Sequence, residues 1–248
     1  MLLALAALML GRGAKSSEAS AALYNQANSL YARGDFAGAI SLYEGAARAG
    51  IKNSDLYYNL GNAYYKSGDR GRAAAWWLRA ERLNPRDPEL KANLALASRQ
   101  VNKALGLQPE SRLMEFFRSL RDLAPARAWA ALLSASIWGF WILLSLRMLS
   151  RRKKLNSLWS LLLVWSIILV MISGAGYLSR RHKETEPAAV VVARDVAAKS
   201  GPGEGFTPVF NLAPGARVLL RECRSEFCQV ELPPGMVGWV QAQALEKI

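Results

Sequence analysis

Histidine and cysteine are almost absent from this sequence of 248 residues, which has one histidine, His182, and two cysteines. One histidine argues against a histidine-based metal site or a catalytic triad. His182 lies among basic side chains, where a solvated position is expected. Two cysteines without a histidine do not form a zinc site, and the sequence has no recognisable nucleophile–base pair, phosphate loop or metal cluster. We therefore expect a protein that is not an enzyme and that uses no cofactor.

Acidic residues are also scarce, with 19 Asp and Glu against 32 Lys and Arg, and the formal net charge is +13. A basic chain is typical of proteins that bind nucleic acid or a membrane surface. The basic residues cluster beside two long apolar stretches, at 147–154 and 180–183, and no nucleic-acid-reading motif is present. This placement favours lipid headgroups and argues against nucleic acid as a partner.

Residues 20–53 are repeated as residues 54–87 with an offset of 34 residues, and a partial third copy follows. Small residues recur where two antiparallel helices would cross closely, and large residues recur where successive hairpins would stack. Gly34 and Gly68 are predicted to end the first helix of each pair in the left-handed conformation. The matched pairs include Asn25/Asn59, Ala27/Gly61, Asn28/Asn62, Tyr31/Tyr65, Gly34/Gly68, Ala39/Ala73, Tyr43/Trp77 and Ala46/Ala80.

The segment 57–85 closely resembles a tetratricopeptide repeat, and 20–53 is a weaker copy that lacks the final proline. Helix 88–104 resembles the extra helix that closes such arrays, with Leu90 and Val101 among the residues expected to cover the last hairpin. The resemblance implies an all-α array that binds peptides on its concave face.

The first helix of each pair is expected to line this concave face. Side-chain amides there both donate and accept, so they can pair with an extended peptide backbone. The alternative is that these asparagines are only common consensus residues. The candidate groove residues are Asn25, Asn28, Tyr58, Asn59, Asn62, Lys66 and Asn93.

Two apolar stretches, 128–146 and 158–178, are each long enough to cross a hydrocarbon core of about 30 Å. The link between them is too short for a domain, so we expect an antiparallel transmembrane hairpin with the rest of the chain on one side of the membrane. The preceding connector, 105–127, contains an amphipathic piece that lies either on the membrane interface or on the repeat domain.

The link holds four consecutive basic residues, 151–154, and short basic loops stay in the cytoplasm. Both soluble parts are therefore expected outside the cytoplasm, although basic residues also flank the outer helix ends. The apolar segment 1–19 resembles a secretory signal but has no basic residue before its apolar core. An uncleaved anchor is the alternative for this segment.

After a polar linker, 179–187, short β-rich runs alternate with turn signals. Residues 188–248 resemble a bacterial SH3 domain, a binding module for cell-wall peptides or proteins. Trp239 is expected either to pack between hairpins or to form a ligand platform. The matching elements are the run 190–192, the turn 200–203, the turn 212–215 before Arg217 and Val218, and Gly238-Trp239-Val240.

The two cysteines, Cys223 and Cys228, flank a predicted hairpin turn between strands 217–223 and 228–232. Outside the cytoplasm, this placement is compatible with a disulfide across the hairpin. Free structural thiols are the main alternative. A redox role is disfavoured because the spacing is not that of a CxxC motif.

The whole order of segments resembles the BatE-type protein of bacterial aerotolerance operons. The resemblance implies an inner-membrane complex with von Willebrand A-domain Bat proteins. The sequence predicts a multidomain protein: an all-α tetratricopeptide array with its capping helix (20–104), a two-helix transmembrane hairpin (128–178) and a small all-β SH3-like barrel (188–248). We expect a membrane-anchored scaffold or adaptor, or alternatively an envelope sensor that binds peptidoglycan.

Overall fold

The computed structural model describes residues 21–107, 111, 113–114, 116–117, 119, 123–150, 156–232 and 235–248. These residues form two compact units, one made of Met1–Gln108 with Pro187–Ile248 and the other of Pro109–Glu186. The signal-like segment 1–19 and the basic link 151–154 lie outside the described residues, as do the arginines of the amphipathic connector.

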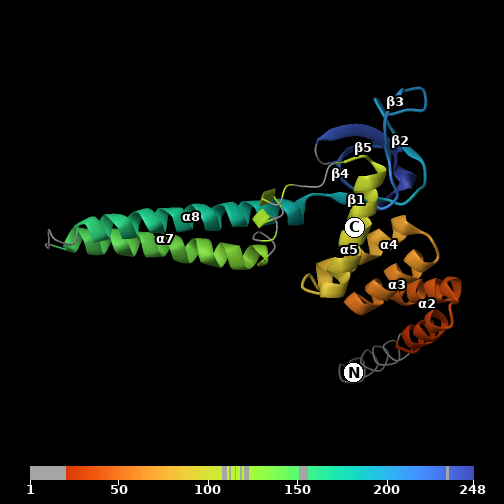
Figure 1. Cartoon of the computed structure of the whole chain (residues 1–248), viewed down its shortest axis with the longest axis horizontal. Helices are drawn as coiled ribbons and strands as arrows, with labels where there is room; N and C mark the ends of the chain where they lie inside the picture. Colours follow the sequence, from red (N-terminus) through yellow and green to blue (C-terminus); the bar gives the residue numbers. More distant parts are fainter. Residues whose placement is uncertain are drawn as a thin grey trace, which may run out of the picture. The chain divides into compact units, whose positions relative to one another are not determined.

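The repeat region is a stack of antiparallel helices (Figure 1). Residues 21–32 are helical and pair with α2 (Phe36–Arg48); α3 (Ser54–Lys66) pairs with α4 (Arg70–Leu83), and α5 (Pro88–Ala104) closes the stack. The loop glycines Gly34 and Gly68 have φ of +82° and +88°, which confirms the predicted left-handed helix ends. Asp35 and Asp69 then cap the following helices by accepting from backbone N–H groups.

The core of the repeats follows the expected alternation of small and large residues. Ala27, Ala39 and Ala73 are fully buried, and Tyr43 and Trp77 are buried beside them. At Gly61 a Cβ atom would lie 2.5 Å from Cδ1 of Trp77, so the indole packs directly onto the backbone of α3. Only glycine allows this approach.

The C-terminal part is an antiparallel sheet of seven strands in the order β3-β2-β6-β5-β4-β1-β7. Its strands are β1 (Ala188–Val191), β2 (Val196–Lys199), β3 (Pro208–Leu212), β4 (Arg217–Arg224), β5 (Phe227–Leu232), β6 (Met236–Gln241) and β7 (Leu245–Lys247). Cys223 and Cys228 face each other across β4 and β5 and are joined by a disulfide. Trp239 is buried, and the guanidinium of Arg224 lies 5.7 Å from its ring centre.

The sheet and the last repeat helices belong to the same compact unit. Ala74 and Ala75 of α4 pack on Val190 of β1, and the guanidinium of Arg79 donates to the Glu246 carboxylate and to the Lys247 carbonyl, at 2.5 and 2.7 Å. The sequence did not predict this contact. The contact consists of apolar packing and one ion pair. Neither produces a periodic pattern in the sequence from which the contact could be predicted.

Val101 of α5 shows the consequence of this packing. It was expected to cover the last hairpin of the array together with Leu90. Leu90 does lie in the repeat core, whereas Val101 lies in the buried cluster of the sheet with Val191 and Val218. The expectation for Val101 was wrong because α5 has apolar residues on two faces, one for each neighbour.

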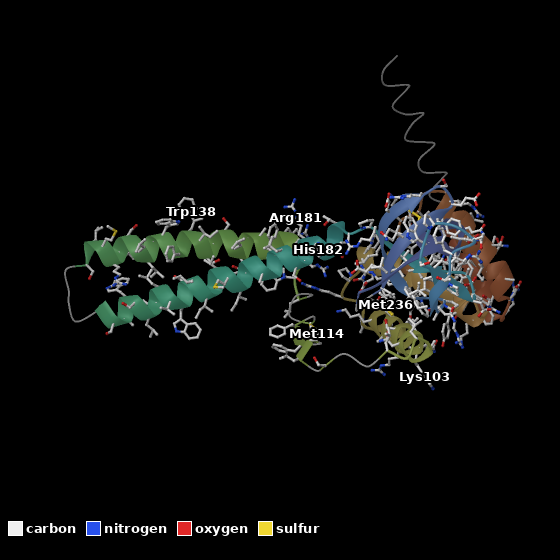
Figure 2. The ribbon with its side chains drawn as sticks, turned by 90° about the horizontal axis from the view of Figure 1, so that it is seen from above. Lys103, Met114, Trp138, Arg181, His182 and Met236 are labelled. Atoms are coloured by element: carbon white, nitrogen blue, oxygen red, sulfur yellow. A yellow bond between two sulfur atoms is a disulfide. The ribbon has the colours of Figure 1, made fainter. Side chains whose placement is uncertain are left out.

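The second unit is a pair of long helices, α7 (Ala126–Leu149) and α8 (Asn156–Thr185), which lie side by side (Figure 1). Ala126–Leu149 and Ser157–His182 are long and apolar enough to cross a membrane. Ser136 and Ser173 are hydrogen-bonded at 3.1 Å between the helices, and only 11% of the apolar window of each span is buried. Trp138, which is 68% exposed, points away from the neighbouring helix (Figure 2).

Candidate peptide-binding site

Half-buried asparagines on the first helices of successive repeats form hydrogen-bonded pairs, which we call the amide ladder (Asn28, Asn59, Asn62 and Asn93). In the first pair, Nδ2 of Asn59 donates to Oδ1 of Asn28 at 3.3 Å. The same nitrogen donates to the hydroxyl of Tyr24 at 2.9 Å, and Oδ1 of Asn28 also accepts from the hydroxyl of Tyr43 at 2.5 Å.

The second pair repeats this pattern with each residue shifted by one repeat. Nδ2 of Asn93 donates to Oδ1 of Asn62 at 3.2 Å and to the hydroxyl of Tyr58 at 3.4 Å. Oδ1 of Asn62 also accepts from the indole N–H of Trp77 at 3.0 Å. Residues related by the sequence repeat therefore make equivalent bonds, which ties the geometry of the ladder to the period of the sequence.

Counting donors and acceptors shows what each pair leaves available. An amide has two N–H donors and one oxygen that accepts two bonds. Asn59 uses both N–H groups in these bonds, and its oxygen has no partner among the described residues. The same holds for Asn93 in the second pair. Asn28 uses both acceptor sites of its oxygen, and the NH2 group of Asn62 contacts the Tyr58 hydroxyl. Each pair thus retains one amide oxygen that can accept from the N–H of an extended chain.

Tyr43 and Tyr58, which bond to the ladder, are neutral at physiological pH. Burial raises the pKa of Tyr43 to about 12, and the nearby Tyr24 and Tyr31 add to the shift. Burial also raises the pKa of Tyr58, whose hydroxyl donates to the Glu89 carboxylate at 3.1 Å. The Tyr43 hydroxyl therefore remains a donor to Asn28, and the Tyr58 hydroxyl donates to Glu89 while it accepts from Asn93.

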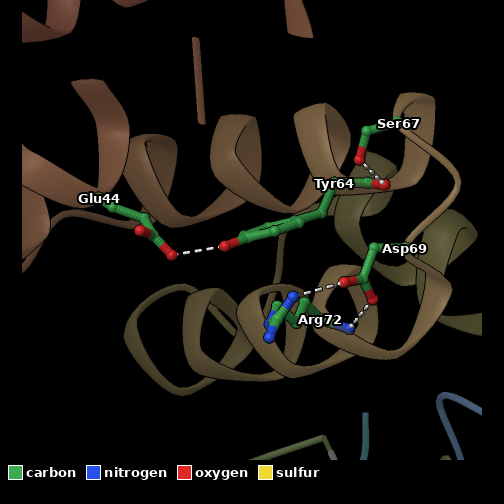
Figure 3. Close-up of polar contacts among 5 residues, drawn as sticks. All are labelled: Glu44, Tyr64, Ser67, Asp69 and Arg72. Atoms are coloured by element: carbon green, nitrogen blue, oxygen red, sulfur yellow. Dashed lines mark hydrogen bonds and ion pairs between the residues drawn. The ribbon is translucent and has the colours of Figure 1, made fainter. Parts of the chain in front are cut away.

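A second buried tyrosine, Tyr64, joins the two repeats. The hydroxyl of Tyr64 donates to the Glu44 carboxylate at 2.5 Å, and Ser67 donates to the Tyr64 carbonyl (Figure 3). Burial, followed by the bond to Glu44, raises the pKa of Tyr64. Asp69 accepts from the backbone and guanidinium of Arg72 in the same region, so these polar groups are structural.

The predicted groove residues divide into two groups in the structure. Asn28, Asn59, Asn62, Asn93 and Tyr58 lie in one hydrogen-bonded system, whereas Asn25 and Lys66 are exposed and have no side-chain bond within the described part of the chain. Tyr24 and Glu89 also belong to this system and were not predicted from the sequence, nor were the bonding roles of Tyr43 and Trp77. The offset of 34 residues relates Tyr24 to Tyr58 and could have indicated the former.

The helical stack with a polar face on its first helices defines the class of helical-repeat interaction domains. Comparison with protein families places the repeats in one such family: the tetratricopeptide repeat matches residues 2–54, 24–88 and 58–105. A comparison with curated proteins found no match to this chain. Tetratricopeptide repeats indicate a role as a protein–protein interaction scaffold, and proteins built from them are typically adaptors without enzymatic activity.

No cluster of three or more His, Cys, Asp or Glu side chains suited to a metal ion occurs within the described residues.

Proposed function

We propose that this protein is a membrane-anchored scaffold that binds an extended segment of a partner along the amide ladder. The observation that carries the proposal is the recurrence of one available amide oxygen in each asparagine pair, on Asn59 and on Asn93. A β-strand-like peptide presents N–H groups at regular intervals, so two such oxygens can hold it in register. The two binding regions correspond to the expected domains, which are the repeats at 20–104 and the second binding module at 188–248.

We further propose that α7 and α8 anchor this scaffold in a membrane. A helix of 24 residues such as α7 is about 36 Å long, enough to span the hydrocarbon core. Residues before and after the hairpin share one compact unit, which requires both to lie in the same compartment. The basic link 151–154 favours the cytoplasmic side for the hairpin tip and the outer side of the inner membrane for the soluble unit.

The partner that we propose is a von Willebrand A-domain membrane protein of the Bat type. This proposal rests on the order of segments, which resembles BatE-type proteins of aerotolerance operons, and on the SH3-like pattern of residues 188–248. The complex would contribute to stress tolerance of the cell envelope.

Quantitative affinity capture from detergent-solubilised membranes tests the ladder and the partner together. We compare the wild type with the double variant Asn59→Ala, Asn93→Ala, which removes both free acceptor oxygens. We expect capture of a von Willebrand A-domain protein to fall by about thirtyfold, the factor that corresponds to losing two hydrogen bonds of about 1 kcal/mol each.

Gln26→Ala is the matched control because Gln26 is exposed on the first helix and is not among the predicted groove residues. Equal capture by the wild type and the ladder variant would refute the groove. Capture that depends on the ladder but yields only unrelated proteins would refute the Bat assignment alone.

A second candidate function is suggested by the sheet, where Phe206, Val209 and Val237 are exposed apolar side chains. Such a surface suits a cell-wall peptide, and an envelope sensor would use it to bind peptidoglycan. Co-sedimentation of the full-length protein with purified peptidoglycan tests this function. Binding that is lost in Val209→Asp but kept in Asn59→Ala would support the sensor, and no co-sedimentation would exclude it.

A further inference from the structure

A cavity of about 450 Å³ lies between the repeats and the sheet within their common unit. Tyr65, Trp77 and Gln100 contribute from the helices, and Val192, Arg194 and Pro214 contribute from two loops of the sheet. The volume is in the range of pockets that hold small ligands or single side chains with their flanking groups. Neither module forms this cavity alone.

The cavity adjoins the amide ladder. Tyr65 follows Asn62 by one turn of α3, and Gln100 follows Asn93 by two turns of α5, so each pair lies on one helix face. Nε2 of Gln100 donates to the Tyr65 hydroxyl at 3.4 Å, and Trp77 both forms the wall and donates to Asn62. The cavity therefore lies further along α3 and α5 than the ladder residues, so a chain that binds the ladder can extend into it.

Two arginines at the cavity come from different modules. Arg70 is the first residue of α4 and Arg194 lies between β1 and β2; both are exposed. Neither makes an ion pair or a side-chain hydrogen bond with any residue that the structure describes.

The acidic residues at the cavity do not cancel this charge. Asp69 caps α4 and pairs with Arg72. Asp195, exposed and at a φ of +53°, supplies one carboxylate against two guanidiniums. The wall below is mainly apolar, with Trp77, Val101 and Pro214 among its residues.

We propose that this cavity binds an apolar side chain of a partner segment whose neighbouring acidic side chain is held by Arg70 and Arg194. Guanidinium–carboxylate bonds are among the strongest polar contacts at interfaces, and apolar anchors in pockets supply most of the binding energy. The inference rests on the proposed scaffold function and deepens it, because it states the chemistry of the partner segment: an apolar residue followed by Asp or Glu.

Photo-crosslinking of the full-length protein in detergent tests the proposal. The probe is the hexapeptide Ser-Gly-photoleucine-Asp-Gly-Ser, blocked at both ends, and the comparison probes carry Asn or Lys in place of Asp. Labelled residues are located by mass spectrometry. We expect the Asp probe to label α5 or the 212–215 turn about tenfold more than the Asn probe, the effect of one lost charge-assisted contact.

Charge-reversal variants test whether Arg70 and Arg194 hold the acidic side chain of the probe. Arg70→Glu and Arg194→Glu each lower labelling by the Asp probe, and their combination admits the Lys probe instead. Arg82→Glu, on the exposed end of the same helix α4, is the matched control and leaves labelling unchanged. All three arginines are exposed, so the substitutions do not disturb a core.

Equal labelling by the Asp and Asn probes, or the same loss in Arg82→Glu as in Arg70→Glu, overturns the proposal. The ladder is tested separately, because Asn59→Ala with Asn93→Ala lowers partner capture without removing the arginines. If the arginine variants keep full partner capture while the ladder variant loses it, the cavity proposal falls and the scaffold proposal stands.

Discussion

Adding one methyl group at Gly61 is expected to destabilise the second repeat, although alanine is the better helix former. The new Cβ atom would lie 2.5 Å from Cδ1 and 2.6 Å from Nε1 of Trp77, so the indole must move. Overpacking of this kind costs about 1–3 kcal/mol, and the Trp77–Asn62 hydrogen bond adds about 1 kcal/mol when it breaks. Alanine regains about 1 kcal/mol of helix propensity, which leaves a net loss of about 2 kcal/mol.

Hydrogen exchange measured by mass spectrometry on the full-length protein reports this loss of stability for each helix separately. Amides of α3 and α4 in Gly61→Ala should exchange about thirtyfold faster than in the wild type, the factor that corresponds to about 2 kcal/mol. Gly45→Ala is the matched control, since Gly45 lies inside α2 and its Cβ atom would meet nothing within 4 Å. This control should stabilise α2 by about 0.5–1 kcal/mol. If both variants slow exchange alike, the packing argument for Gly61 is refuted.

The contact between α4 and the sheet predicts that Arg79→Ala increases exchange in β1 and β7 by about tenfold, whereas Arg82→Ala, on the exposed side of the same helix, has no effect. The raised pKa values of Tyr43 and Tyr64 predict that stability is intact below pH 10, the ordinary tyrosine pKa, and falls as the pH rises from 10 to 12; each tyrosine contributes about 1.4 kcal/mol per pH unit because the unfolded state alone loses the proton. Chemical denaturation across this pH range should show a smaller decrease in the free energy of unfolding for Tyr43→Phe and Tyr64→Phe than for the wild type. The same decrease in these variants and the wild type would contradict the raised pKa values. In the hairpin, Gly176→Leu should push α7 and α8 apart, since a Cβ atom there already meets the Trp129 ring at 2.6 Å; lower yields of engineered interhelical disulfides measure this, and an unchanged yield would show that the helices are not held by this contact.

The repeat architecture was predictable because the key positions of the 34-residue repeat each have one structural role. Gly34 and Gly68 end helices, and Gly61 and Ala27 allow close crossings, so the sequence alone indicates the helices and their pairing. The bonds within the amide ladder were not predictable in the same way. The sequence places Asn59 and Asn62 on one face, but which groups they bond depends on rotamers and on the separation of neighbouring helices.

The sheet was predicted from short β-rich runs that alternate with turn signals, and the antiparallel β fold is confirmed. Its likeness to an SH3 domain stays a prediction. The packing of β1 and β7 on α4 was missed, because a pattern in one chain segment shows which side chains are apolar and not which neighbour covers them. Val101 illustrates this, since its apolar character was recognised and its neighbour was not.

The interrupted order of the compact unit has a consequence for biogenesis. Val101 and Ala74 emerge from the ribosome before the hairpin, whereas Val190 and the strands that cover them follow it. The early helices must wait, with this surface open, until the later segment has been made. Under the membrane anchoring proposed above, a hairpin that inserts only one of its two helices would separate the two halves and leave that surface uncovered for proteases. Completion of the soluble core would then depend on insertion of both helices.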